Sequence, residues 1–225
     1  MEKFRQTNRD RVKGKIILPF YFFLFAFLGF PQTTAPGGPG KDAQWATAGK
    51  QAIGTSASLE SKVWFTLAQG VMTEVYYPDV TVANVHMLQF VVVNPKTKKV
   101  ETERDDAVHQ IKPLKIDSLS FQQINTAKSG EWKITKTYTT DPERDSVLID
   151  VRFWAKRPGL NLYVYYDPSL SNTGMKDEAY SPAPRIVMGP DPGPSKSESI
   201  RPTSDFGLGA SDGEMVSAVV FSSPI

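Results

Sequence analysis

The residues best suited to chemistry lie around Tyr76, Tyr77 and Pro78, with Glu74 and Asp79 on either side. Tyrosine rings stack on the apolar faces of sugars while their hydroxyl groups form hydrogen bonds, and glycosidases place two carboxylates across a sugar. Glu74, however, belongs to a strand-like alternation, which favours a solvent-facing residue. We therefore predict no catalytic residue here. Tyr76 and Tyr77 are candidate contacts for carbohydrate, and filling the space between sheets is the alternative.

Other kinds of site find little support in the sequence. There are no cysteines, so a thiolate metal site, a cysteine nucleophile and a disulfide framework are excluded. The two histidines, His86 and His109, lack ligand-like spacing, and we expect ordinary surface or edge residues. Asp167, Asp177 and Glu178 form an oxygen-rich region, but their spacing fits no EF-hand, so a solvated loop is expected. We predict no metal and no cofactor.

The charge distribution argues against nucleic acid as a partner. The formal net charge is +2, but six of the 26 basic residues and only two of the 24 acidic residues precede Pro36. The rest of the chain is therefore slightly acidic, and it lacks the basic surplus that phosphate backbones require.

The amino-terminal segment resembles an export signal. Residues 1–15 are basic, residues 16–30 contain no charge, and small residues follow at positions 33–35. This order predicts a secretory signal peptide over residues 1–35, with cleavage near its end. The apolar stretch is shorter than the ~20 residues of a membrane span, but an uncleaved anchor is the alternative. We expect a secreted, periplasmic or extracellular protein that is not attached to the membrane after cleavage.

The body of the chain, residues 36–225, shows the two-residue alternation of β-strands. Residues 132–139, 147–154 and 160–167 each place apolar side chains on one face. In the last of these, Tyr163 and Tyr165 lie opposite the apolar set. No segment carries an apolar stripe of helical length. The pattern predicts an all-β fold, a large antiparallel β-sandwich.

Turn-forming residues separate these strands. Residues 68–70, 94–98 and 141–145 interrupt apolar runs, as expected between antiparallel strands. A stretch rich in proline, glycine and serine follows over residues 181–212, and it predicts a long loop. A further strand is expected over residues 215–222.

An ordered series of short segments resembles a known family, the N-terminal domain of bacterial glucoamylases and glucodextranases in glycoside hydrolase family fifteen. No single segment is diagnostic, and the resemblance rests on their order and spacing. The segments are APGGPG at 35–40, SKVWFTL at 61–67, GVMTEVYYPDVTVANVHMLQF at 70–90, NTAKSG at 125–130, KTYTTDPERD at 136–145 and YDPSLSN at 166–172.

The resemblance implies a supersandwich of the galactose mutarotase-like kind, followed in the family by an α/α-barrel that carries both catalytic glutamates. Nothing in this chain corresponds to that barrel. By the same resemblance, Tyr76, Tyr77 and Asn84 belong to a loop expected near the catalytic domain. The resemblance also implies that the N-terminal domain is truncated at its C-terminal end.

The resemblance implies a non-catalytic module of a secreted exo-acting α-glucan hydrolase, with an α-glucan or oligosaccharide and the barrel as partners. A stand-alone carbohydrate-binding domain and an inactive fragment are the alternatives.

Overall fold

The computed structural model describes residues 46, 48–58, 60–173, 177–180, 185–186, 202–203 and 207–222. All of them belong to one compact unit. The predicted signal peptide lies outside the described residues. Within these ranges no helix is long and apolar enough to cross a membrane.

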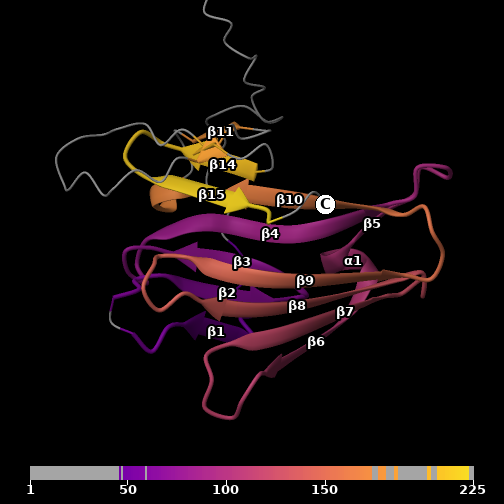
Figure 1. Cartoon of the computed structure of the whole chain (residues 1–225), viewed down its shortest axis with the longest axis horizontal. Coiled ribbons are helices and arrows are strands. Elements are labelled where there is room, and N and C mark those ends of the chain that lie inside the picture. Colours follow the sequence, from indigo (N-terminus) through magenta and orange to yellow (C-terminus); the bar gives the residue numbers. More distant parts are fainter. Residues whose placement is uncertain are drawn as a thin grey trace, which may run out of the picture. The chain divides into compact units, whose positions relative to one another are not determined.

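The first sheet, called the larger sheet below, follows the order β1-β2-β3-β4-β10, and β5 also pairs with β4. All of its pairings are antiparallel. Figure 1 shows β10 beside β4, although the two strands are far apart in the chain. The strands are β1 (Ala52–Thr55), β2 (Trp64–Ala68), β3 (Val71–Tyr76), β4 (Ala83–Val93), β5 (Val100–Thr102) and β10 (Asn161–Pro168).

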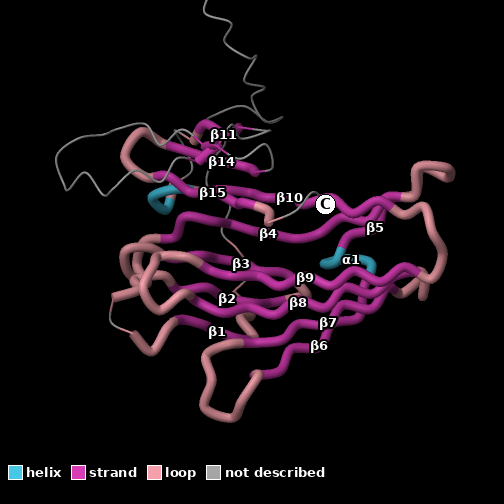
Figure 2. The backbone as a smooth tube through the Cα atoms, viewed as in Figure 1, coloured by secondary structure: helices cyan, strands magenta, loops and turns pink. Residues whose placement is uncertain are grey.

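The second sheet is a four-stranded antiparallel meander, β6-β7-β8-β9. Its strands are β6 (Ala107–Pro113), β7 (Phe121–Ala127), β8 (Trp132–Thr140) and β9 (Val147–Ala155). The chain passes from the larger sheet to the meander through α1 (Glu103–Asp106), a single helical turn. Figure 2 shows how little helix accompanies the strands. The all-β antiparallel fold predicted from the alternation is therefore confirmed.

A smaller sheet, β11-β14-β15, lies beyond β10, and β12 pairs with β13. Its strands are β11 (Glu178–Tyr180), β14 (Gly207–Ser211) and β15 (Val216–Val220); the pair is β12 (Arg185–Ile186) and β13 (Pro202–Thr203). The prediction of one loop over residues 181–212 is wrong at β12, β13 and β14, of which β14 is the longest. That strand consists mainly of small residues, so it carries no apolar alternation to read.

The core lies between the larger sheet and the meander. The rings of Phe65 on β2 and Tyr138 on β8 stack with their centroids 5.7 Å apart. Trp132 and Ile134 of β8 are fully buried beside them. Burying side chains of this size stabilises a fold by roughly 1.5–3 kcal/mol each. These contacts hold the two sheets face to face.

A buried ion pair lies inside this core. Lys136 of β8 donates from Nζ to Glu103 Oε2 at 2.7 Å, and both side chains are fully shielded from water. Lys136 also donates to the Gly70 carbonyl at 3.1 Å. Asn125 Nδ2 donates to Glu103 Oε1 at 2.5 Å, and the Phe90 amide donates to Oε2 at 2.8 Å. The pair therefore ties α1 to strands of both sheets.

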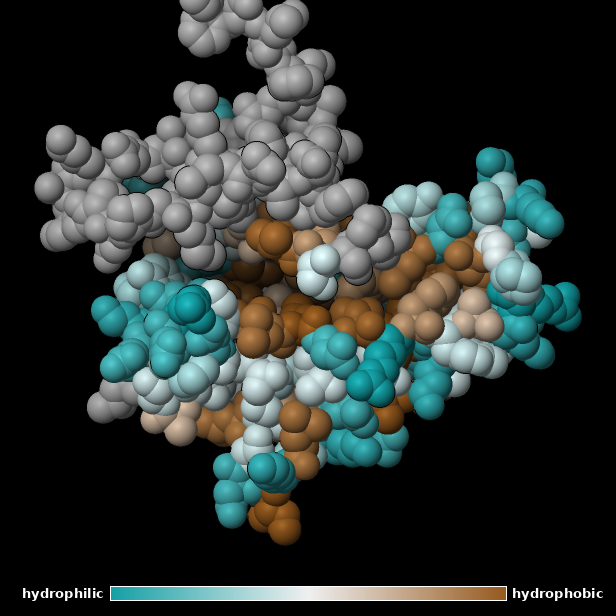
Figure 3. All heavy atoms as spheres, viewed as in Figure 1, coloured by the Kyte–Doolittle hydropathy of each residue, from teal (hydrophilic) through white to brown (hydrophobic). Residues whose placement is uncertain are grey.

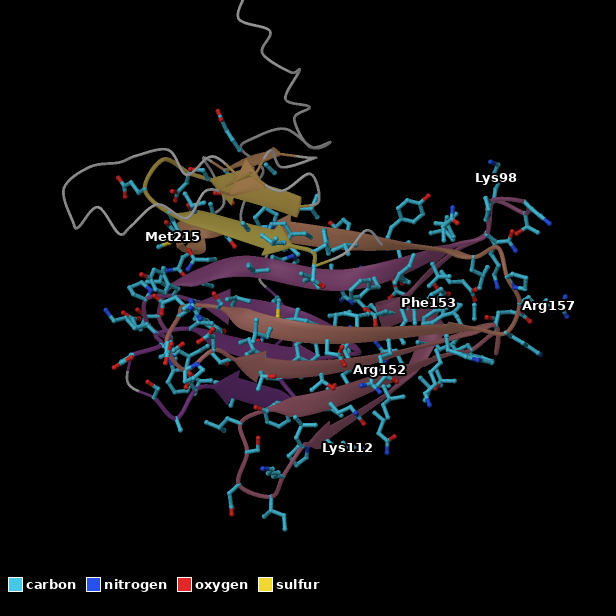
Figure 4. The ribbon with its side chains drawn as sticks, viewed as in Figure 1. Lys98, Lys112, Arg152, Phe153, Arg157 and Met215 are labelled. Carbon is cyan, nitrogen blue, oxygen red and sulfur yellow. The ribbon has the colours of Figure 1, made fainter. Side chains whose placement is uncertain are left out.

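The inner faces of β9 and β10 are only partly buried. In Figure 3 hydrophobic side chains form a band across the middle of the visible face. Figure 4 labels Phe153 and its neighbour Arg152 on β9. Phe153 packs against the core, whereas the Arg152 side chain is exposed. The predicted alternation of β9 is thus confirmed.

Candidate functional site

The loop between β3 and β4, residues 77–82, is closed by its own hydrogen bonds. The Tyr77 amide donates to the Val82 carbonyl at 3.0 Å. Asp79 Oδ1 accepts from the Thr81 amide at 2.8 Å and from the Thr81 hydroxyl at 2.5 Å. These two bonds lower the pKa of the exposed Asp79 carboxyl. Asp79 therefore acts as an internal brace of the loop.

Asn84, one of the predicted site residues, joins this loop to β4 and to a later segment of the chain through side-chain hydrogen bonds. Its Nδ2 donates to the Tyr77 carbonyl at 2.8 Å and to the Val82 carbonyl at 3.3 Å. Its Oδ1 accepts from the Ser171 amide at 3.0 Å, in the short 3₁₀ turn η1 (Leu170–Asn172). Asn84 is only 3% exposed. Its side chain is thus engaged by protein groups and lies beneath the surface.

Asn172 provides a second brace. Its Oδ1 accepts from the Ala83 amide at 2.7 Å, and its Nδ2 donates to the Thr81 carbonyl at 2.9 Å. Its backbone is left-handed, with φ of 67°, a conformation that asparagine tolerates better than most residues. Two asparagines from distant parts of the chain therefore fix the loop of residues 77–82. The sequence predicted a role for Asn84 but none for Asn172. The hydrogen bonds of Asn84 to Ser171 and of Asn172 to Ala83 each join segments almost ninety residues apart.

Tyr76 is held at the end of β3. Its hydroxyl donates to Glu74 Oε2 at 2.6 Å, and Lys50 Nζ lies 2.5 Å from the same oxygen. Burial, followed by the contact with Glu74, raises the pKa of Tyr76 well above its ordinary value. Glu74 is therefore already paired with a cation and a hydroxyl. The structure brings Tyr77 and Asn84 into direct contact, and Tyr76 is the residue before Tyr77.

A second polar group lies where β4 pairs with β10, beside an irregularity in their register. His86 Nδ1 lies 2.7 Å from Asp167 Oδ2. Tyr165 also hydrogen-bonds to Asp167, and burial, followed by the charge of Asp167, raises the pKa of Tyr165. Tyr163, two residues earlier on the same strand, is exposed. The sequence placed both tyrosines on the polar face of β10 but did not connect His86 with Asp167, which lies 81 residues away.

The oxygen-rich region around Asp177 contacts the backbone of the η1 turn. Asp177 Oδ2 accepts from the Leu170 amide at 2.8 Å. Burial and, to a smaller extent, the charges of Asp212 and Asp167 raise the pKa of Asp177. Among the residues that the structure describes, no cluster of three or more His, Asp or Glu side chains is arranged to hold a metal ion.

Three comparisons relate the chain to known proteins. Residues 35–190 match the family described as glucodextranase, domain N. A glucoamylase from Clostridium sp. (strain G0005) is 38% identical over 154 residues, which cover 67% of this chain and 22% of the relative. A crystal structure of a bacterial glucoamylase complexed with acarbose superposes with a TM-score of 0.62 at 38% identity, over 66% of this chain and 23% of that one.

These matches confirm the resemblance found in the sequence and the antiparallel all-β fold. In both relatives the match spans less than a quarter of the protein. The similarity therefore concerns one region of each relative, and the activity of the whole relative is not carried over with it.

Proposed function

Because the chain belongs to the glucodextranase domain N family, we propose that it is the non-catalytic N-terminal module of a secreted, exo-acting α-glucan hydrolase. The observation that carries this proposal is the extent of the match, which covers most of this chain but only 22% of the Clostridium glucoamylase. In this proposal the module packs on an α/α-barrel catalytic domain and shapes its surface. Its α-glucan or oligosaccharide substrate is bound through that parent enzyme.

The loop of residues 77–82 is the part of the module that we assign to this contact. Asn84 and Asn172 hold its backbone from two directions, so the loop can present a fixed surface. A rigid loop loses little conformational freedom when a second domain packs on it. Tyr76 and Tyr77 supply amphipathic rings there, both half-buried in the present chain.

The neighbouring carboxylates support an accessory role. Glu74 is paired with Lys50 and Tyr76, and Asp79 braces its own loop. Among the residues that the structure describes, neither Glu74 nor Asp79 faces a second carboxylate across a cleft. A glycosidase needs two such groups on opposite sides of the scissile bond.

The proposal predicts no turnover by the chain itself. Purified residues 36–225 should release no glucose from maltooligosaccharides, as followed by a coupled glucose assay. Clear turnover would show that the module is itself an enzyme, and would contradict the proposal.

The contact role of the loop is tested in a chimera. The matched region of this chain replaces its counterpart in the Clostridium glucoamylase, and Tyr77→Ala is introduced. We expect kcat/KM for maltooligosaccharides to fall roughly three- to tenfold, because a mispositioned loop disturbs the substrate edge, while Tyr77→Phe retains most of the activity.

The matched control for the loop is Lys98→Ala. Lys98 lies in the turn beyond the other end of β4, an 11-residue strand, and therefore roughly 35 Å away. This variant should leave kcat/KM unchanged. Equal effects of the two substitutions, or none from Tyr77→Ala, would remove the loop from the domain contact.

A further inference from the structure

We propose that the outer face of the larger sheet, where β4 pairs with β10, is a binding site for a neutral saccharide chain. The site, called the β4–β10 platform below, consists of His86 on β4 and Tyr163, Tyr165 and Asp167 on β10. The inference goes beyond the proposed function, because the platform needs no catalytic domain to bind sugar.

The strand register places the platform residues on one face. Tyr163, Tyr165 and Asp167 lie opposite Val91, Gln89 and Met87, respectively. The intervening residues of β10 (Leu162, Val164 and Tyr166) pack against the core. Because side chains alternate along a strand, the platform residues point away from the core, with about 7 Å between successive ones.

Two aromatic rings are available on this face. Tyr163 is 51% exposed and Tyr165 is 45% exposed. An exposed phenol ring offers an apolar surface to the C–H groups of a sugar ring. The Tyr163 hydroxyl accepts from Asn161 Nδ2 at 3.4 Å and can still donate to a sugar hydroxyl, whereas the Tyr165 hydroxyl bonds to Asp167. A spacing of about 7 Å along the strand would allow the two rings to meet successive or alternate units of an extended sugar chain.

A polar pair lies at the end of the tyrosine row. Asp167 contacts both His86, at 2.7 Å, and Tyr165, and its side chain is 34% exposed. A carboxylate held by two neighbours can accept hydrogen bonds from adjacent sugar hydroxyl groups in a fixed geometry. No platform residue is a lysine or arginine; Arg104 lines the adjoining hollow, but the platform itself carries the Asp167 carboxylate. It therefore suits a neutral polyhydroxylated ligand better than a phosphate or sulfate.

A hollow of about 50 Å³ adjoins the pair, lined in part by Thr73, His86, Met87 and Arg104. A hollow of this size holds a few waters at most. The hollow is too small for a sugar ring, but it can receive one hydroxyl or hydroxymethyl group. It gives the platform a fixed point from which a bound chain can extend along the tyrosines.

The outer face of the meander supplies a contrast. Trp154 of β9 is 56% exposed, but it lies opposite Lys133, with Arg152 two residues away. Among the residues that the structure describes, no hydrogen bond between a carboxylate and an imidazole lies beside Trp154. Trp154 therefore serves as a matched control for a large exposed ring that lacks the polar pair.

Calorimetric titration of the full chain with maltoheptaose tests the site. We expect binding in the millimolar range or tighter, and a roughly three- to tenfold loss of affinity for Tyr163→Ala and for Tyr165→Ala. Tyr165→Phe should lose less, because the ring remains. Trp154→Ala should bind like the parent chain. Circular dichroism of each variant establishes that the sheet is intact.

Three outcomes overturn the proposal. The first is no binding of maltoheptaose or of cellohexaose. The second is affinity that both tyrosine variants retain, or that Trp154→Ala reduces equally. The third is a dimer that both tyrosine variants dissociate, because the face is then an interface between two copies. None of these affects the chimera experiment on Tyr77, so failure of the platform and failure of the module role remain distinguishable.

Discussion

At the scale of single residues, Lys136 and Glu103 form an ion pair that is fully shielded from water. Burial lowers the pKa of Lys136, while the neighbouring Glu103 opposes this shift. A buried charge is tolerated only when it is paired and hydrogen-bonded. Here Glu103 receives Asn125 and the Phe90 amide in addition to the ammonium group, so its oxygens remain satisfied.

We predict that Lys136→Met destabilises the domain by about 3–5 kcal/mol, because it leaves Glu103 as an uncompensated buried charge. Urea denaturation of purified protein measures the change. The double variant Lys136→Met/Glu103→Gln should recover part of the loss, since the amide removes the buried charge and its single oxygen still accepts from either Asn125 Nδ2 or the Phe90 amide.

The control for this experiment is Lys133→Ala on the same strand, at an exposed position. It should change the free energy of unfolding by no more than ~0.5 kcal/mol. A double variant as unstable as Lys136→Met would show that the lysine acts through packing, such as its contact with the rings of Phe90 and Tyr138, and not through its charge.

At the scale of elements, the turn between β2 and β3 fits against the meander. Gly70 has φ of +78°, and a Cβ atom added there would overlap the ring of His109. That ring is held by Asn125 Oδ1 at 3.3 Å and by the Arg104 carbonyl at 3.2 Å. The turn and the ring therefore interlock, and the Gly70 carbonyl also receives Lys136.

We predict that Gly70→Ala destabilises the domain by at least about 2 kcal/mol, because a strained backbone is combined with a steric overlap. Gly130 is the matched control, since its φ is +71° and nothing lies within 4 Å of an added Cβ. Gly130→Ala should cost only about 1 kcal/mol. Thermal melts compare the two variants, and equal losses would mean that the His109 ring moves aside freely.

Local sequence patterns predicted the elements whose neighbours are close in the chain. The alternation gave the correct faces of β8, β9 and β10, and the turn residues separated the hairpins. Lys136 escaped this pattern, because a charged residue at an inward position carries no signal of its partner. The His86–Asp167 pair and the two-asparagine brace were also missed, since each depends on pairing between distant segments.

At the scale of the whole molecule, residues 1–35 contain the predicted signal peptide. We propose that they direct export and are removed, so expression in a secreting bacterium should yield a protein shortened by about 33–35 residues. Mass spectrometry of the exported product measures the loss. A paired charge substitution, Leu24→Arg/Phe25→Arg, should keep the chain at full length inside the cell. Full-length parent protein in the membrane fraction would instead indicate an uncleaved anchor.

The return of β10 to β4 sets the order in which the domain can form. Val164 pairs with Phe90, and the entire meander lies between them in the chain, so this contact closes a loop of roughly seventy residues. The meander needs only adjacent hairpins, and such local pairings form faster than distant ones. The β6–β9 hairpins should therefore fold early, and β10 should dock late.

Amide hydrogens of β10 would then exchange through openings that leave the meander protected. A ligand bound to the β4–β10 platform would suppress those openings and slow the exchange of the β10 amide hydrogens.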